Sequence, residues 1–250
     1  MELPEDIVRF DDAQRRAIAL LRDVTQRLEA GMSARTIAQL AETRLTNHGF
    51  TGWYHAPEVA FAAGIGSAVS RLVPGKLEPG QLVCIDLGPT DGEAYGDVAY
   101  TFRFGGETPG DLARGSTLEV ARGCVRAACG YASRWKTVGE IQIFSAAWAV
   151  NNRMGLANPG VGHRVLPREA TPGASLLGAQ WPRAAHAATS LMRNRIHRLH
   201  PVRMDGMFAI RPVVRGRDGA FAAFEEMVYV SPEGRVVLGR STVDEAGTLD

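Results

Sequence analysis

The sequence lacks the features that mark secreted, membrane-spanning or nucleic-acid-binding proteins. Only three of its 250 residues are cysteine, and their spacing fits no metal site. No apolar run approaches the roughly eighteen residues of a membrane span. The formal net charge is +1, so no overall field attracts nucleic acid or an anionic membrane. The first ten residues lack the basic and then apolar pattern of a signal peptide, and we therefore expect a reduced, cytoplasmic protein.

What remains is an ordinary globular composition. Apolar residues make up 45% of the chain and charged residues 22%. A length of 250 residues allows one domain with a sizeable core. Cys84 lies within an apolar strand pattern, and we predict that it behaves as a buried small hydrophobe.

Hydrophobic periodicity predicts four helices. Apolar residues fall three and four positions apart in the first of them, from Ala17 to Leu28. Ser33 suits the N-cap of the second helix, and Thr137 with Glu140 matches a capping box at the start of the fourth. The predicted helices cover residues 11–28, 33–48, 111–132 and 137–154.

Apolar runs with turn signals between them predict strands. Residues 81–88 form a buried strand and 95–104 its antiparallel return, because Asp91-Gly92 is a hairpin signal. An extended region precedes them, after the second helix. The other predicted strands cover residues 207–214, 221–230 and 236–238.

These elements form a coarse repeat. Two helices and then a hairpin occur twice, with Ser33 and Thr137 about 104 residues apart. No linker or low-complexity stretch separates the halves. We therefore predict a single α+β domain over residues 1–250, in which helices cover one side of a curved antiparallel sheet with internal pseudo-two-fold symmetry.

The first hairpin carries two aspartates that call for a partner. Folding around Asp91-Gly92 would place Asp86 directly opposite Asp97, with Cβ atoms ~4.5–5.5 Å apart on one face. Asp86 lies in an apolar strand, where an unpaired carboxylate is costly. Two such carboxylates need a cation, a shared proton or a basic partner. The pair therefore indicates either a functional site or a structural ion-pair network.

The last hairpin opposes unlike charges. Arg211 and Glu225 are symmetric about Asp218-Gly219, so they should meet across the strands. One interpretation is a structural cross-strand salt bridge. The other is that Glu225 is a metal ligand and Arg211 an anion clamp beside it.

Histidines offer weaker signals. His163 follows Gly162 in a glycine-punctuated segment and is either structural or catalytic. His197 and His200 are three residues apart within an arginine-rich stretch, 193–203. That stretch is either a solvated face or a partner- or phosphate-binding patch.

These residues resemble the creatinase/methionine aminopeptidase family. Residues 80–88 followed by 95–102 are similar to its first metal-binding hairpin, and 205–212 with 224–231 to its two closing strands. The resemblance spans about residues 10–240 and is weak over 156–205. It implies the pita-bread fold, without the separate amino-terminal domain of the Xaa-Pro peptidases.

The family holds two divalent metals with two Asp, one His and two Glu. Asp86 and Asp97 match the two aspartates, Glu225 the second glutamate and His163 the histidine. The first glutamate, a metal ligand and a candidate base, is replaced by Arg211. The resemblance thus implies Asp86, Asp97, His163 and Glu225 as metal ligands, and His163 and Glu225 as catalytic groups.

Two further positions depart from the family. A substrate-side histidine is expected near position 68, where the sequence has Ser67-Ala-Val-Ser70. A second histidine followed by glutamate is expected after His163, where the nearest equivalent is Arg168-Glu169. With Arg211, three polar groups of the family site are therefore missing.

The leading hypothesis is a repurposed C–N bond hydrolase that acts on a small or peptide-like substrate bearing a carboxylate, which Arg211 anchors. Its site would hold one divalent metal (Mn, Fe, Co, Mg or Zn) or none, because Arg211 opposes a second dication. The alternative is a noncatalytic pita-bread binding module, and the third option an active metal-dependent aminopeptidase. A homodimer is compatible with each.

Overall fold

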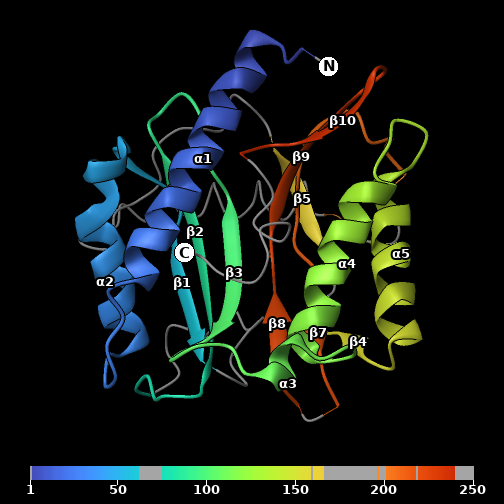
Figure 1. Ribbon diagram of the computed structural model, residues 1–250. Coiled ribbons are helices and arrows are strands. Elements are labelled where there is room, and N and C mark those ends of the chain that lie inside the picture. Colours follow the sequence, from blue (N-terminus) through green and yellow to red (C-terminus); the bar gives the residue numbers. More distant parts are fainter. Residues whose placement is uncertain are drawn as a thin grey trace.

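A computed structural model of the 250-residue chain (Figure 1) describes residues 2–61, 75–158, 160–165, 196, 201–217 and 219–239. The helices are α1 Glu5–Thr25, α2 Ala34–Arg44, the 3-10 turn η1 Leu45–His48, α3 Pro109–Leu112, α4 Thr117–Tyr131 and α5 Val138–Asn151. The strands are β1 Gly52–Phe61, β2 Leu82–Thr90, β3 Val98–Arg103, β4 Gly155–Leu156, β5 Gly162–Val165, β6 Gly206–Ile210, β7 Val213–Arg215, β8 Phe221–Ala223, β9 Glu226–Ser231 and β10 Gly234–Val237.

Local sequence explains where the helices begin and end. The Ser33 side chain accepts a hydrogen bond from the Thr36 N–H and so caps α2. The capping box of Thr137 and Glu140 is present at the start of α5, as predicted. Gly49, at a φ of 75°, ends η1 in the left-handed region that glycine adopts without strain.

Hydrogen bonding divides the strands into three antiparallel sheets. The first has the order β1-β2-β3, the second β10-β9-β6-β5 and the third β4-β7-β8. Figure 1 shows α1 and α2 on the side of the first sheet and α4 and α5 on the side of the second. One large core cluster contains residues of both halves, from Phe10 on α1 to Met227 on β9. This arrangement confirms the predicted α+β class and helix-covered antiparallel sheet.

The register of the first hairpin corrects one prediction. Asp86 pairs with Ala99, and Leu87 with Val98, so Asp97 is not directly opposite Asp86. Each residue of β2 pairs with a residue two positions later in the chain than a turn centred on Asp91-Gly92 predicted. Next to the turn, Thr90 forms a bridge with Tyr95. A shift of two keeps the side-chain face, so the aspartates remain diagonal neighbours on the same side of the sheet.

The closing hairpin has the predicted register. Ile210 pairs with Glu226 and Val213 with Ala223, which leaves Arg211 and Glu225 in the interruption between the paired segments. The predicted strands 207–214 and 221–230 are each divided at this interruption, into β6 with β7 and β8 with β9. Arg211 and Glu225 therefore both occupy irregular backbone between strands.

Several other boundaries differ from the predictions. The first helix begins at Glu5, six residues before the predicted start, and the stretch 111–132 is divided into α3 and α4. The ten-residue strand β1 was predicted only as an extended region. Cys84 is buried, as predicted. Among the described residues, no helix is long and apolar enough to cross a membrane.

Candidate metal centre

The two aspartates of the first hairpin lie deep in the molecule. Asp86 is on β2, a strand whose nine residues are all buried, and Asp97 immediately precedes β3. Their side chains expose only 5% and 1% of their surface. Carboxylates so buried must be neutralised or hydrogen-bonded, and the structure provides a different set of partners for each.

Helix α1 fixes the backbone at Asp97. The buried Gln14 side chain accepts the Asp97 N–H at 2.8 Å and donates to the Asp97 carbonyl at 2.9 Å. A Cβ on the preceding residue, Gly96, would lie 2.4 Å from Ala17 Cβ, so only glycine allows this close approach. Gln14 therefore positions Asp97, a role that sequence reasoning missed because it depends on a contact 83 residues away.

His163 reaches Asp97 from the second half of the chain. It lies on β5, and its Nε2 is 2.8 Å from Asp97 Oδ2. Its Nδ1 lies 3.2 Å from the carbonyl of Arg164. A Cβ on Gly162 would lie 1.9 Å from the Ala209 carbonyl oxygen, so glycine is required for β5 to approach β6 here. The sequence prediction that brought together His163 and the aspartates holds for Asp97.

His55 on β1 is a member of the cluster that the sequence reasoning missed. Its Nε2 lies 3.1 Å from Asp97 Oδ1 and 3.5 Å from Asp86 Oδ1. His55 pairs with Gly88, where an added Cβ would lie 2.4 Å from the imidazole, so the missing side chain makes room for the ring. Burial alone would lower the pKa of His55, but Asp86 and Asp97 raise it to about 10.

Arg211 forms its ion pair with Asp86 and not with the predicted partner Glu225. Its Nη1 lies 2.9 Å from Asp86 Oδ2, and no ion pair joins it to Glu225, although both residues are described. Burial raises the pKa of Asp86, and the positive charges of Arg211 and His55 offset part of that rise. Arg211 therefore neutralises Asp86, and the predicted cross-strand salt bridge with Glu225 is not formed.

Glu225 enters the cluster through contacts between the two halves. Its backbone N–H donates to the Ala99 carbonyl at 2.9 Å, while Thr101 Oγ1 donates to the Ala223 carbonyl at 2.8 Å. Burial, followed by the charges of Asp97 and Asp86, raises the pKa of Glu225 well above its usual value. Its carboxyl group therefore favours the protonated form or a bound cation.

Side-chain atoms of the described residues form two candidate groups of metal ligands that share Asp97. One group is His55, Asp86 and Asp97, and the other is Asp97, His163 and Glu225; within each, the ligand atoms lie within 4.8 Å of one another. Oxygen and imidazole ligands suit ions such as Mn, Fe, Co and Zn.

Two observations show that a cation fits here. Each histidine has its Nδ1 3.2 Å from a backbone carbonyl, which orients the ring and leaves Nε2 directed at the carboxylates. Asp86 Oδ1 is buried without a hydrogen-bond partner, which is costly unless a cation, water or substrate satisfies it.

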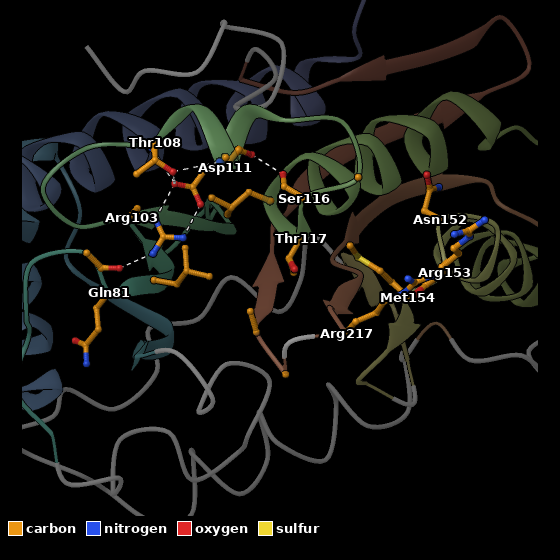
Figure 2. A pocket seen from close by; sticks show the side chains of 17 residues that line it. Gln81, Arg103, Thr108, Asp111, Ser116, Thr117, Asn152, Arg153, Met154 and Arg217 are labelled. Carbon is orange, nitrogen blue, oxygen red and sulfur yellow. Dashed lines mark hydrogen bonds and ion pairs between the residues drawn. The ribbon is translucent and has the colours of Figure 1, made fainter.

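A cavity among the described residues lies elsewhere. It has a volume of about 900 Å³ and lies where α3, α4, the end of α5 and the hairpin after β7 converge (Figure 2). Among the described residues that line it, Asp111 is the only acid, and Arg103 neutralises it through two bonds of 2.5 and 2.6 Å. None of the ligand residues lines it, so the candidate chemistry is separate from this cavity.

Several sequence predictions lie outside the described residues. They concern the missing histidine near position 68, Arg168-Glu169, and both His197 and His200. Of the arginine-rich stretch, Arg203 is described, and its Nη1 donates to the Trp135 carbonyl at 2.6 Å. This bond joins Arg203 to the loop between α4 and α5.

A carboxylate hairpin, completed by a histidine and a glutamate from the second half of the chain, defines a class: proteins with the pita-bread fold and its metal-binding scaffold. The sequence matches the profile of metallopeptidase family M24 over residues 9–232, and the chain belongs to this family. No curated protein sequence is significantly similar to it.

Solved structures agree on the fold. The X-Pro aminopeptidase of Thermotoga maritima has a TM-score of 0.74 at 17% identity and matches 96% of this chain and 62% of its own. The prolidase of Pyrococcus furiosus has the same TM-score and identity, with 96% and 65% covered. The methionine aminopeptidase of Thermotoga maritima has a TM-score of 0.70 at 16% identity, with 96% and 98% covered. The chain thus spans less than two thirds of the first two proteins and nearly all of the third.

Proposed function

We propose that this chain is a C–N bond hydrolase-type enzyme with a modified M24 site. In this proposal Asp97, His163 and Glu225 hold one divalent ion, and Arg211 binds the carboxylate of a small or peptide-like substrate. The supporting observation is that Arg211 pairs with Asp86 and leaves the other three ligands together as one group. We propose that Asp86, predicted from the sequence as a fourth ligand, acts mainly as the counter-ion of Arg211.

The chemistry of the ion would be of the kind that family M24 scaffolds use. A bound divalent ion polarises a carbonyl group or lowers the pKa of a water molecule. Two carboxylates and one imidazole would suit Mn, Fe, Co or Zn, and Mg less well because of the nitrogen ligand. His55, which shares Asp97 with the other group, is a further candidate ligand.

Arg211 has the exposure and the spare donors that substrate binding requires. Its side chain is 23% exposed, whereas that of Asp86 is 5% exposed. A guanidinium has five N–H donors, and Asp86 occupies only part of them. Nε of Arg211 is buried without a hydrogen-bond partner. We propose that a substrate carboxylate accepts from the donors that Asp86 leaves over.

A metal-free version of the same enzyme remains the alternative within this proposal. Two internal cations, Arg211 and protonated His55, offset the charges of Asp86 and Asp97. Burial and the charges of Asp97 and Asp86 raise the pKa of Glu225, so this carboxyl group would be the proton donor to a leaving nitrogen. His163, at 2.8 Å from Asp97, would be the second group that moves a proton.

Metal content decides between these versions. The protein is purified without chelator, reconstituted with Mn, Fe, Co or Zn in turn, and analysed for ions per chain. We expect one ion, which Asp97→Ala abolishes. Two ions would contradict the proposal and indicate an unmodified dinuclear peptidase. No ion under any condition would leave the metal-free version.

Arg211 variants test the substrate-binding role. Small carboxylate-bearing amides and dipeptides are the substrates to assay. Arg211→Ala and Arg211→Lys should raise KM more than they lower kcat, with Lys retaining part of the affinity because it keeps the charge but not the fork of donors. An unchanged KM in both variants would refute the role of Arg211.

The competing hypothesis is a noncatalytic binding module. The ion pair between Arg211 and Asp86 favours it, because a charge reversal in a metal site is how such a site would be lost. In that case Asp97→Asn should leave partner binding unchanged, whereas neutralising the arginine-rich stretch 193–203 should weaken it.

A further inference from the structure

The cavity in Figure 2 carries an excess of positive charge. Its volume of about 900 Å³ lies within the range of about 300–1,000 Å³ that is usual for small-molecule sites. Figure 2 shows the pair of Arg103 and Asp111 on one side and Arg153 and Arg217 on the other. Because Arg103 and Asp111 neutralise each other, the net charge of the described lining residues is that of the other two arginines.

These two arginines are joined but not neutralised. Arg217 Nε donates to the backbone carbonyl of Arg153 at 3.1 Å, which fixes the Arg217 side chain against the end of α5. The bond uses one of the five N–H donors of Arg217 and leaves both of its Nη groups. Within the described part of the chain, no carboxylate forms an ion pair with either guanidinium, and both residues are exposed. Two cations on one wall of a cavity therefore have donors to spare for an anion.

The backbone of Arg153 also favours a role for its side chain. Helix α5 ends at Asn151 with Asn152 as its cap, and Arg153 follows with a φ of 61°. Of the residues that the structure describes, it is the only one besides glycine with a positive φ. Glycine is the usual residue at this place after a helix because it adopts the left-handed region without strain. The arginine here thus retains a cationic side chain although its backbone is strained.

The lining suits a phosphate ester better than a carboxylate. A phosphate group carries a charge of about −1.5 to −2 near pH 7, which two arginines can balance. A guanidinium also matches phosphate oxygens with paired N–H donors. The remaining wall includes the apolar side chains of Leu82, Leu118 and Met154, which can contact the organic part of a ligand.

We propose that this cavity binds a small phosphate ester. Arg153 and Arg217 bind its phosphate group, and its organic part contacts Leu82 and Leu118. This inference is independent of the proposed hydrolase, because none of the lining residues belongs to the candidate metal centre.

Calorimetric titration with phenyl phosphate is the first test. Metal-free protein is used, so that the phosphate has no metal ion to bind. We expect saturable binding with a Kd below about 1 mM. Benzoate, which has the same ring but a single negative charge, should bind at least about tenfold more weakly.

Variants of the two arginines test their part in binding. Arg217→Gln should weaken phenyl phosphate at least about tenfold, because it removes a charge-assisted hydrogen bond. Arg153→Gly should do the same without lowering the thermal midpoint, because glycine adopts the φ of 61° without strain. The matched control is Arg215→Gln: Arg215 is also exposed and lies two residues from Arg217, but it does not line the cavity. This control should leave the affinity unchanged.

NMR spectra locate the bound ester. Backbone amide signals of residues 115–118, 152–154 and 219–220 should shift as phenyl phosphate is added. The imidazole signals of His55 and His163 should not shift, because both histidines lie in the candidate metal centre and not in the cavity.

Four results would overturn the proposal. One is the absence of saturable binding up to about 10 mM phenyl phosphate. Another is an affinity that Arg217→Gln and Arg153→Gly leave unchanged. A third is benzoate binding as tight as that of phenyl phosphate, which would assign the cavity to carboxylates. The last is a shift confined to His55 and His163, which would place the phosphate beside Arg211.

Discussion

The two aspartates of the first hairpin lie on one face of one sheet, yet their surroundings differ. Asp97 is hydrogen-bonded by two imidazoles, at 2.8 and 3.1 Å, and its backbone is fixed by Gln14. Asp86 is paired with a guanidinium at 2.9 Å, faces Glu58 across the ladder, and keeps one oxygen without a hydrogen bond. The pKa of Asp97 is lowered, mainly by these histidines against the effect of burial, while that of Asp86 is raised.

The different partners of Asp97 and Asp86 determine which carboxylate can exchange its positive partner for a metal ion. A histidine can lose its proton and bind a metal through the same nitrogen, so the positive charge beside Asp97 is replaceable. Arginine cannot be deprotonated in a protein, so the positive charge beside Asp86 is permanent. One side of the site thus keeps the chemistry of a metal ligand, and the other has a built-in cation.

The largest expected effect comes from removing that cation. Arg211→Met leaves Asp86 buried and unpaired, and we expect the metal-free protein to lose about 3–5 kcal/mol of unfolding free energy. Urea unfolding measures the loss. The control is Arg9→Met, which removes an exposed ion pair with Glu93 and should cost at most about 1 kcal/mol. A similar loss of unfolding free energy in both variants would show that Arg211 is not needed to neutralise Asp86.

Metal affinity compares the two carboxylates directly. Asp97→Asn should weaken Co or Mn binding at least 100-fold, which corresponds to about 2.7 kcal/mol. Asp86→Asn should weaken it less than about tenfold, because Arg211 already neutralises Asp86. Calorimetric titration of both variants gives the ratio. Equal losses would mean that the ion bridges both aspartates.

A methyl group at Gly88 should displace His55, which lies beside both Asp86 and Asp97. Gly88→Ala would displace His55, since the new Cβ would lie 2.4 Å from the ring, and we expect a cost of about 1–3 kcal/mol. The control is Gly130→Ala on α4, where no atom lies within 4 Å of the new Cβ. That change should stabilise the protein by about 0.5–1 kcal/mol. The imidazole signals of His55 in NMR spectra would report its displacement.

The smallest effect is a pH dependence at Glu225. Because its pKa is raised in the folded state, the folded metal-free chain binds a proton that the unfolded chain releases above its usual pKa. Stability therefore falls as pH rises above about 4.5, until the folded group ionises as well. Glu225→Gln cannot ionise, so its stability should fall less than that of the unaltered protein as the pH rises above about 4.5. An identical pH profile for both chains would show that Glu225 is already ionised.

The sequence predicted the fold better than the details of the site. Helix periodicity, the capping box at Thr137 and the family pattern were enough for the fold class and for both hairpins. The face shared by Asp86 and Asp97 was predicted correctly, although the register was wrong by two residues. Turn type alone sets that register, and the Asp91-Gly92 signal did not specify it.

The parts that were missed depend on contacts between distant segments. His55 lies on β1, whose pairing with β2 has irregularities between Trp53 and His55 and between His55 and Glu58. Such bulges break the alternation that identifies a strand from sequence. The partner of Arg211 was predicted wrongly because it comes from another sheet, 125 positions earlier in the chain, where no local pattern reports it.

The two hydrogen bonds between the Gln14 side chain and the Asp97 backbone also have a consequence for folding during translation. The loop after β10 closes over the same helix: Gly239 donates its backbone N–H to Asp11 at 2.7 Å, and its Cα leaves no room for a side chain beside Gln14. Glu225, too, is synthesised long after the aspartates it joins. During translation the first hairpin leaves the ribosome without its later partners, so a nascent chain carries the carboxylates but not an assembled site. An assembled site can then form only after the second half of the chain, with His163 and Glu225, has been synthesised.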